Sequence, residues 1–384
     1  MRRRTVEVRV GNVPMGGDNP IRVQSMTTVP TTDTMGCVEQ IKRIVDAGGE
    51  YVRLTTQGVR EAENLEAIRN RLVVADGYTV PLIADVHFNA NVADVAARYA
   101  DKVRINPGNY IDPARKFRKI DFTDAEYAAE LHRLEDRFVP LLDLCRHNGT
   151  ALRLGVNHGS LSDRIMSRYG DTPEGMVESC MEFLRVCVKE HFDQVVISVK
   201  ASNTQVMTTT MRQMVHAMDL EDMHFPLHLG VTEAGEGEDG RLKSAVGIGA
   251  LLLDGIGDTI RVSLSEAPEN EIPVAYGILQ AARARITKTE YISCPGCGRT
   301  MYDLEQTIAR VKAATSQFKG LKIGIMGCIV NGPGEMADAD FGYVGAGRGK
   351  VSLYRGKECV EMNIPEADAV EHLLRLIESS QHAG

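Results

Sequence analysis

Between residue 22 and about residue 285, one pattern of hydrophobic and polar positions repeats along the chain. Each unit has a short apolar stretch, a polar loop, and a segment whose apolar residues recur at helical spacing. The apolar stretches predict strands at residues 22–26, 51–55, 81–86, 102–107, 151–157, 194–200, 226–231 and 259–265. Helical segments follow, for example at residues 38–47, 62–74, 176–191 and 271–285. Eight such units in roughly 260 residues predict an α/β fold, a (β/α)8 TIM-type barrel.

An open doubly wound sheet is the alternative fold for this alternation. It would require a glycine-rich phosphate-binding turn after the first strand. The chain has Gln24-Ser25-Met26-Thr27-Thr28 there, so the barrel is favoured.

After residue 285 the alternation stops, which predicts a boundary between a barrel domain at residues 1–285 and a second domain at residues 286–384. The second domain is expected to be a small α+β domain. Its predicted elements are a helix at residues 303–318, a hairpin of residues 341–344 and 350–354, and a last helix from residue 364 to about residue 379. The loop of residues 345–349 is rich in glycine, but Val351 follows Lys350 where a phosphate-binding loop needs Ser or Thr. We therefore expect a hairpin turn.

Composition and charge narrow the class of protein. The 384 residues carry a formal net charge of -8, which argues against a nucleic-acid or membrane-surface binder. The basic start lacks the apolar region of a signal peptide, and no apolar run reaches the ~20 residues that span a bilayer. Eight cysteines without a short disulfide framework indicate a reducing, cytoplasmic location. Buried free thiols are expected for four cysteines in helix-like stretches: Cys37, Cys145, Cys180 and Cys187.

Three of the other cysteines are spaced like ligands of a metal or cluster. Cys294-Pro295-Gly296-Cys297 is a tight CxxC turn, and Cys328 follows an apolar strand-like run. Three thiolates with one non-cysteine position suit an iron–sulfur cluster that keeps one iron exchangeable. A zinc knuckle is the alternative and normally takes four Cys or His ligands. Within residues 291–384 the histidines are His372 and His382, so the pattern favours a cluster.

Cations gather at the expected active end of the barrel, where the strands have their C-terminal ends. Arg53, Arg104, Arg153, Lys200 and Arg261 lie on these strands, together with Asp85 and His87. Long cations in apolar strands are costly to bury without an anion, and phosphates would supply one. The alternative is that they pair with Asp85, Glu233 and the acidic loop of residues 236–239. Glu233 among these cations is placed either to transfer a proton or to form a plain salt bridge.

Several ordered motifs resemble the 4-hydroxy-3-methylbut-2-enyl diphosphate synthase family of the methylerythritol phosphate route to isoprenoids. They are Gly17-Asp18-Asn19-Pro20-Ile21-Arg22-Val23-Gln24-Ser25-Met26-Thr27, Val103-Arg104-Ile105-Asn106-Pro107-Gly108-Asn109, Arg153-Leu154-Gly155-Val156-Asn157, Ser198-Val199-Lys200-Ala201-Ser202, His228-Leu229-Gly230-Val231-Thr232-Glu233-Ala234-Gly235, Ser293-Cys294-Pro295-Gly296-Cys297-Gly298-Arg299 and Cys328-Ile329-Val330-Asn331-Gly332-Pro333-Gly334-Glu335. The likeness covers nearly the whole chain. The chain lacks the central domain of the plant-type enzyme, so it resembles the two-domain bacterial form.

The resemblance implies an iron–sulfur oxidoreductase that converts 2-C-methyl-D-erythritol 2,4-cyclodiphosphate into 4-hydroxy-3-methylbut-2-enyl diphosphate. It implies a [4Fe–4S] cluster bound by Cys294, Cys297, Cys328 and Glu335. It also implies Glu233 as the acid and a substrate shell of Arg53, His87, Arg104, Asn106, Arg153, Asn157, Lys200, Arg261, Ser263 and Asn331. No flavin or nicotinamide motif is present, so ferredoxin or flavodoxin is expected to deliver electrons.

Chain direction predicts a homodimer whose active site is shared between subunits. The expected helix at residues 271–285 carries the chain roughly 22 Å away from the active end of the barrel. The link at residues 286–290 reaches at most about 18 Å. Two rival functions remain at this stage: a barrel transferase resembling dihydropteroate synthase with a zinc-bound appendage, and a non-catalytic cluster-binding electron carrier. The first does not explain three cysteines with Glu335, and the second does not explain the cations.

Overall fold

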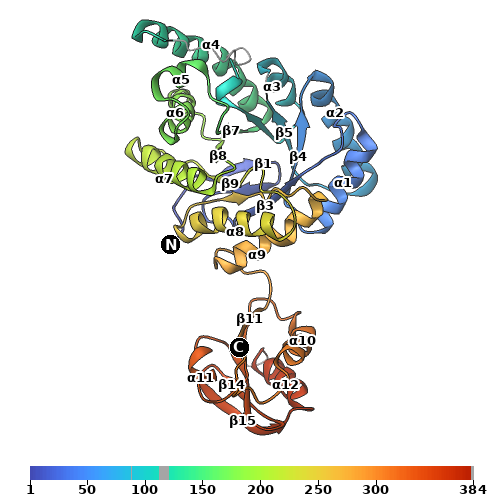
Figure 1. The fold of residues 1–384 in the computed structure, drawn as a ribbon. Coiled ribbons are helices and arrows are strands. Elements are labelled where there is room, and N and C mark those ends of the chain that lie inside the picture. Colours follow the sequence, from blue (N-terminus) through green and yellow to red (C-terminus); the bar gives the residue numbers. More distant parts are fainter. Residues whose placement is uncertain (88, 112–120, 382–384) are drawn as a thin grey trace. The chain divides into compact units, whose positions relative to one another are not determined.

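The computed structural model describes residues 1–87, 89–111 and 121–381. The chain divides into two compact units, Met1–Arg285 and Ile286–Gly384 (Figure 1). Each unit has its own hydrophobic core, and each is described by itself.

Unit 1 is a barrel of eight parallel strands, as predicted. They are β3 (Arg22–Met26), β4 (Tyr51–Thr56), β5 (Leu82–Val86), β6 (Lys102–Ile105), β7 (Ala151–Asn157), β8 (Val195–Lys200), β9 (His228–Leu229) and β10 (Thr259–Ile260). Their order is β8-β7-β6-β5-β4-β3-β10-β9, and a parallel bridge between Ile197 and Leu227 joins the two edges. The TIM-barrel prediction is thus confirmed.

Nine helices named α1 to α9 accompany these strands within the described residues. They are α1 (Thr34–Asp46), α2 (Val59–Asn70), α3 (Ala90–Ala96), α4 (Asp124–Asn148), α5 (Asp163–Tyr169), α6 (Pro173–Lys189), α7 (Thr204–Leu220), α8 (Gly237–Leu253) and α9 (Glu271–Ala281). The start of α6 shows how the sequence sets a boundary. The Thr172 hydroxyl accepts a hydrogen bond from the Gly175 N–H, and Pro173 occupies the first helical position, where it needs no partner.

Some predicted boundaries were wrong. The strand expected to reach residue 107 ends at Ile105, because the Asn106 side chain accepts from the Gly108 N–H and caps a 3-10 turn, Pro107–Asn109. Strands β9 and β10 are two residues each. Strand β9 ends before Gly230. At Gly230 the backbone lies so close to the neighbouring segment that an added Cβ would be 2.7 Å from the Arg261 carbonyl oxygen. Helix α9 ends at Ala281 instead of residue 285.

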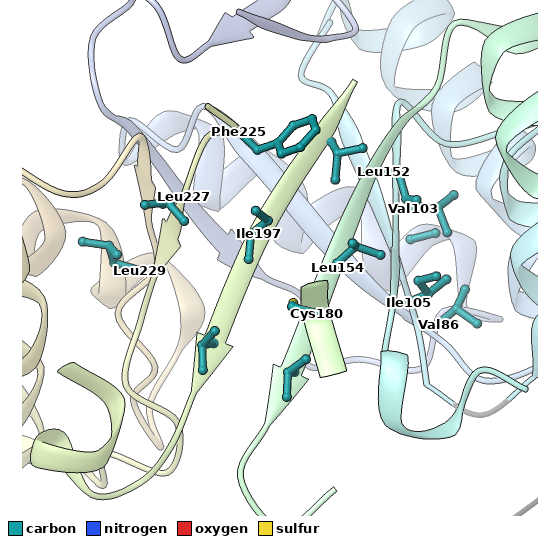
Figure 2. Packing of buried hydrophobic residues seen from close by; sticks show 14 of the residues in the cluster. Val86, Val103, Ile105, Leu152, Leu154, Cys180, Ile197, Phe225, Leu227 and Leu229 are labelled. Carbon is teal, nitrogen blue, oxygen red and sulfur yellow. The ribbon is translucent and has the colours of Figure 1, made fainter. Parts of the chain in front are cut away.

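The core of unit 1 lies between the outer face of the strands and the helices. Figure 2 shows Val103 and Ile105 of β6 beside Leu152 and Leu154 of β7, with Cys180 from α6 packed on the same layer. The four cysteines expected as buried free thiols, Cys37, Cys145, Cys180 and Cys187, are free and buried. No helix in the described parts of the chain combines the length and apolar character needed to cross a membrane.

A short N-terminal hairpin packs at the starts of the barrel strands, and the sequence pattern did not predict it. It consists of β1 (Val8–Val10) and β2 (Val13–Met15). Its apolar side chains form a small cluster with the inward-facing residues Tyr51, Ile83, Ala151 and Val196. The hairpin therefore adds an apolar cluster at the end of the barrel opposite the expected active site.

Unit 2 is built on one five-stranded sheet in the order β11-β12-β13-β14-β15. Its elements are β11 (Glu290–Ser293), α10 (Leu304–Thr315), β12 (Lys322–Met326), α11 (Gly332–Glu335), β13 (Phe341–Gly347), β14 (Lys350–Arg355), β15 (Glu358–Pro365) and α12 (Ala369–Gln381). The predicted hairpin is present as β13 and β14. Residues 364–366 do not begin a helix, because Ile364 pairs with Val351 in the sheet and α12 begins at Ala369.

Candidate functional site

The interior of the barrel is lined by polar side chains where such a barrel usually holds branched apolar ones. The register in which neighbouring strands pair brings these polar side chains together. Asp85 of β5 lies beside Arg104 of β6, and Arg104 lies beside Arg153 of β7. These side chains point inward because alternate residues, such as Val103 and Leu152, pack outward in the core. Arg53, Asp85, Arg104 and Arg153 are all at most 5% exposed.

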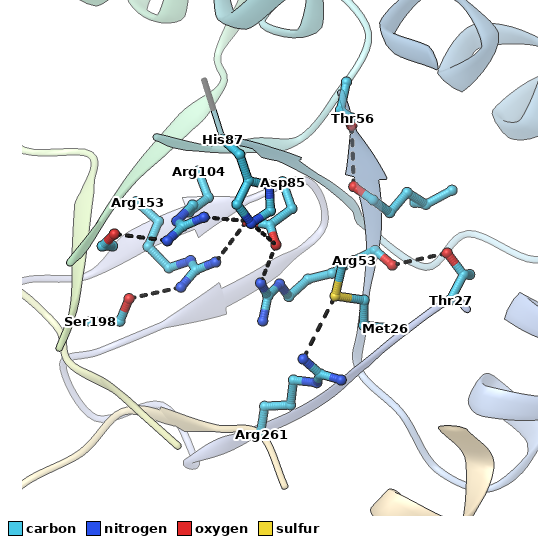
Figure 3. A network of polar contacts seen from close by, with 12 residues as sticks. Met26, Thr27, Arg53, Thr56, Asp85, His87, Arg104, Arg153, Ser198 and Arg261 are labelled. Atoms are coloured by element: carbon cyan, nitrogen blue, oxygen red, sulfur yellow. Dashed lines mark hydrogen bonds and ion pairs between the residues drawn. The ribbon is translucent and has the colours of Figure 1, made fainter. Parts of the chain in front are cut away.

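One carboxylate joins three of these guanidinium groups (Figure 3). Asp85 forms a short contact with Arg53, and its other oxygen lies 3.4 Å from both Arg104 and Arg153. Arg153 also donates to the Ser198 hydroxyl at 2.7 Å, and Arg104 donates to the Gly155 carbonyl at 2.9 Å. Although burial opposes its ionisation, the three arginines hold the pKa of Asp85 well below its ordinary value.

The network leaves several buried donors unused. Within the described residues, the Nε atoms of Arg53, Arg104 and Arg153 have no hydrogen-bond partner, and neither has one terminal nitrogen of Arg53. Burial lowers the pKa of Arg53 to about 10, so it remains charged at neutral pH. Buried donors of this kind are normally satisfied, so the arrangement is suited to an anionic ligand.

Other predicted residues of the barrel have protein partners. Arg261 pairs with Glu271 at 3.2 Å, and that buried carboxylate was not anticipated because it lies in the first turn of α9. Asn106 donates to the Ser160 hydroxyl at 3.0 Å while capping the 3-10 turn. His87 lies 3.9 Å from Asp85, and burial lowers the pKa of its ring.

The remaining predicted barrel residues differ in their surroundings. Lys200 ends β8 and is 7% exposed, Asn157 ends β7, and Ser263 follows β10. Glu233 is exposed and has a left-handed backbone with φ of +54°. Its carboxylate forms no hydrogen bond or ion pair with the residues that the structure describes, and the Lys243 ammonium donates to its carbonyl at 3.3 Å.

A second candidate site lies within unit 2, and all four predicted cluster ligands line it. Cys294, Cys297, Cys328 and Glu335 surround a cavity of about 130 Å³, together with Arg299 and Asn331. Parallel pairing of β11 and β12 explains why two of the cysteines meet, because Cys294 and Cys328 follow the adjacent ends of these strands. Glu335 reaches the cavity from α11, a single helical turn that begins after Asn331.

Backbone and side-chain donors face the cysteine sulfurs. The Gly327 N–H donates to Cys294 Sγ at 3.3 Å. Hydrogen bonds from Arg299, which sequence reasoning did not single out, lower the pKa of the Cys297 thiol. A lowered thiol pKa favours the thiolate, which is the form that ligates metals.

The donors around this cavity are of the kinds that ligate iron–sulfur clusters. Among the described residues, no three His, Cys, Asp or Glu side chains are close enough together to hold one metal ion. The donors surround a space of about 130 Å³, which is larger than the roughly 10–15 Å³ that one water molecule requires. Three soft thiolates with N–H donors directed at sulfur are typical of iron–sulfur ligation.

The fold and the two sites together define a class: TIM-barrel proteins with a cation-lined interior and a cysteine-bearing C-terminal domain. A family model described as the GcpE TIM-barrel domain matches residues 5–276, and the GcpE protein C-terminal domain matches residues 290–379. The chain belongs to the GcpE family.

Two named relatives cover almost the whole chain. A 4-hydroxy-3-methylbut-2-en-1-yl diphosphate synthase (flavodoxin) of Bacteroides thetaiotaomicron is 46% identical over 99% of this chain and 98% of that protein. A 4-hydroxy-3-methylbut-2-en-1-yl diphosphate synthase (ferredoxin) of Synechococcus sp. (strain CC9902) is 52% identical over 98% of this chain and 94% of that protein. A solved structure of Yersinia pestis dihydropteroate synthase is 12% identical with a TM-score of 0.45 over 73% of this chain and 100% of that one, and we draw nothing from a likeness at that level.

The alignment with the Bacteroides relative also shows a difference in organisation. It runs over 602 positions, whereas this chain has 384 residues, so the difference of at least 218 positions lies opposite gaps in this chain. The relative therefore carries at least 218 residues that have no counterpart in this chain.

Proposed function

We propose that this chain catalyses the reductive ring opening and dehydroxylation of 2-C-methyl-D-erythritol 2,4-cyclodiphosphate to 4-hydroxy-3-methylbut-2-enyl diphosphate, a step of isoprenoid biosynthesis. Family membership and the names of its relatives support this activity. The observation that carries it is the layer of buried cations in the barrel, which exceeds the charge of its shared carboxylate, Asp85. A diphosphate supplies the missing negative charge.

In this proposal, Arg53, Arg104, Arg153 and Lys200 bind the diphosphate. Asn106, Asn157, Ser263 and Asn331 provide polar contacts, and His87 and Arg261 complete the shell. Arg261 contributes less than the others, because Glu271 already neutralises it. Glu233 donates the proton with which the hydroxyl leaves as water, and its exposed carboxylate is free to exchange protons with solvent.

The cavity of unit 2 would hold a [4Fe–4S] cluster through Cys294, Cys297, Cys328 and Glu335. When bound, this cluster supplies the single electrons that the reduction consumes. The Gly327 N–H and Arg299 stabilise the negative charge of the thiolates that ligate it. We propose flavodoxin or ferredoxin as the electron donor, on the strength of the names of the two relatives.

We further propose that the working unit is a cytoplasmic homodimer whose active site combines the barrel of one subunit with the cluster domain of its partner. An exposed apolar stripe on α8 supports self-association. Leu242, Val246 and Leu253 recur on one face of this helix and are 56%, 62% and 75% exposed. Exposed apolar stripes of this kind mark protein interfaces.

Subunit complementation tests the dimer. An Arg104→Ala chain and a Cys297→Ala chain should each have strongly reduced activity alone and regain activity when mixed, because one of the two sites in a mixed dimer then has both an intact barrel and an intact cluster domain. Restored activity supports the shared site. Confirmed subunit exchange without restored activity would show that each subunit uses its own cluster domain.

The activity itself is tested on protein purified without oxygen and loaded with iron and sulfide. The expected result is a brown protein that converts the cyclodiphosphate when reduced flavodoxin or ferredoxin is supplied. A colourless, zinc-loaded protein without this activity would favour the transferase alternative. A brown protein that accepts electrons but leaves the cyclodiphosphate unchanged would favour the electron carrier.

A further inference from the structure

Lys102 lies inside the barrel without a counter-charge of its own. It is the first residue of β6 and shares the inward face of that strand with Arg104, two residues further on. Its side chain is fully buried, and its ammonium nitrogen has no hydrogen-bond partner among the described residues. The Nζ atom lies 4.8 Å from the centre of the Tyr51 ring.

The charged groups that act on Lys102 are cations. Arg153 on β7 and Arg53 on β4 both disfavour its protonation. Asp85 on β5 is the nearby carboxylate, but Arg53, Arg104 and Arg153 already share it. Lys200, the last residue of β8, is a second buried amine and brings no negative charge.

The remaining titratable neighbours offer no negative charge. His228 on β9 is fully buried, and neither of its ring nitrogens has a hydrogen-bond partner among the described residues. Burial and the adjacent cations hold the pKa of His228 well below its ordinary value, so the ring is neutral. Tyr51 donates its hydroxyl to the Val13 carbonyl at 2.7 Å, and burial raises its pKa, so it also stays neutral.

Lysine and arginine respond differently to such surroundings. A guanidinium keeps its charge when buried, whereas a lysine amine readily gives up its proton. Burial, followed by Arg153 and Arg53, holds the pKa of Lys102 well below its ordinary value. Among the interior cations, Lys102 is therefore one that can change charge when a ligand changes the local field.

We propose that Lys102 is uncharged in the ligand-free barrel and takes up a proton when a dianionic diphosphate binds among the arginines above it. This inference rests on the proposed function, because it deepens the way in which that site recognises its substrate. It makes Lys102 a positioning and selectivity residue that acts on the ligand through charge, without contact. Ligands with two negative charges gain from the protonation, and ligands with one gain less.

The proton balance is simple. The Nζ amine gains one proton, which forms an N–H bond, and the proton comes from solvent or buffer. Each phosphorus of the cyclodiphosphate carries one strongly acidic oxygen, already ionised at neutral pH. The ligand therefore neither supplies nor takes the proton.

Titration calorimetry of the cluster-loaded protein with the cyclodiphosphate, without reductant, tests the proposal. The titration is repeated near neutral pH in two buffers that differ in ionisation enthalpy, and the difference gives the number of protons taken up. For wild-type protein we expect an uptake of about one proton per site. For Lys102→Met we expect the uptake to be lost and the affinity to fall about tenfold.

The arms of this experiment separate the two proposals. Wild-type protein that binds the cyclodiphosphate without proton uptake would overturn the inference alone. Wild-type protein that does not bind it would overturn the proposed function, and this inference with it. Because Lys200 and His228 also have pKa values well below the ordinary range, Lys200→Met and His228→Asn are matched variants. Uptake that survives in Lys102→Met but vanishes in either of them would assign the proton to that residue instead.

Thermal unfolding distinguishes the two roles of Lys102, because replacing a lysine that only stabilises the fold would lower the melting temperature. Below the ordinary lysine pKa of 10.5, the unfolded chain holds a proton on Lys102 that the folded ligand-free chain lacks under this proposal. Folding must then release that proton, which lowers the free energy of unfolding. Lys102→Met should therefore raise the melting temperature by about 2–4 °C near neutral pH, with the gain shrinking as pH approaches 10.5. The exposed Lys319→Met serves as the control. A lower melting temperature in Lys102→Met would show that the lysine is charged and stabilising, contrary to the proposal.

Discussion

The two candidate sites of this protein are built on opposite principles. The barrel site lies on strands, is almost fully buried, and has its charges arranged by a shared carboxylate, Asp85. The cavity of unit 2 lies on turns and on the single helical turn α11, and both Cys297 and Glu335 are exposed.

The comparison shows two ways of preparing a site for a charged group. In the barrel, the protein accepts the cost of burying like charges so that a diphosphate meets a ready-made set of donors. In unit 2, the donors range from the buried Cys328 to the exposed Cys297 and Glu335, and they surround a space without converging on one point. We expect the group that binds to complete their arrangement. Substitutions should therefore affect folding stability in the barrel and cofactor retention in unit 2.

The largest expected effect is the loss of the cluster in Cys328→Ser. A hydroxyl is a much poorer ligand for iron than a thiolate, so purified protein should retain little iron while its melting behaviour without cofactor stays unchanged. Iron and sulfide content per chain measures this. Cys359→Ser is the matched control, because Cys359 is a partly buried cysteine of the same unit that was not predicted as a ligand. Equal loss of iron in both variants would mean that the ligand set is wrong.

Asp85→Asn should cost about 3–5 kcal/mol of unfolding free energy, because it leaves three buried guanidiniums without their carboxylate. Denaturant unfolding measures it. Glu335→Gln, which neutralises an exposed carboxylate of unit 2, should change stability by less than about 0.5 kcal/mol. Similar costs in the two variants would remove the contrast between the sites.

The same carboxylate predicts a pH dependence. The pKa of Asp85 is lower in the folded protein than in the unfolded chain, so its contribution is fully present above the ordinary value of 3.8. It is lost only as the pH falls below 3.8 and through the folded value. Wild type and Asp85→Asn should therefore differ by a constant amount from neutral pH down to about pH 5 and converge only in stronger acid.

Sequence reasoning predicted the barrel and most of its charged interior, because alternating strands reveal which residues face inward. Pairing of the cations with Asp85 was only the alternative interpretation, and the structure confirms that part of it. Sequence reasoning did not predict that three arginines share this one carboxylate or that Glu271 pairs with Arg261, since those contacts depend on side-chain distances across the barrel. The hairpin of β1 and β2 was missed because three-residue strands are too short to show a period. In unit 2, cysteine spacing indicated three ligands, whereas Glu335 was predicted only through family resemblance.

Arg104→Ala and Lys200→Ala should each weaken substrate binding or turnover by about 1.5–3 kcal/mol, the value of a charge-assisted contact. Calorimetric affinity and steady-state rates measure the effect. Arg212→Ala is the control, because Arg212 is an arginine of the same unit that pairs with Asp254 and is half exposed. Unchanged affinity and rate in both test variants would mean that these cations serve only the structure of the barrel.

The smallest effect is expected at Arg299, which faces the Cys297 thiol. Its backbone N–H and its guanidinium both lower the pKa of that thiol from the ordinary 9.0, and Arg299→Ala removes the second of these hydrogen bonds and the charge while leaving the first. In reduced, cluster-free protein near neutral pH, alkylation of Cys297 should slow by about two- to threefold, because a smaller fraction of the thiol is ionised. Above pH 9.0 the rates should converge, since the thiol is then ionised in both proteins. Peptide mass spectrometry of the alkylated protein gives the rate at Cys297 alone, and the exposed Arg348→Ala on the β13–β14 turn controls for net charge. If Arg299→Ala and wild type react at the same rate near neutral pH, the donors around this cavity do not prepare the thiolate, and the bound group alone must do so.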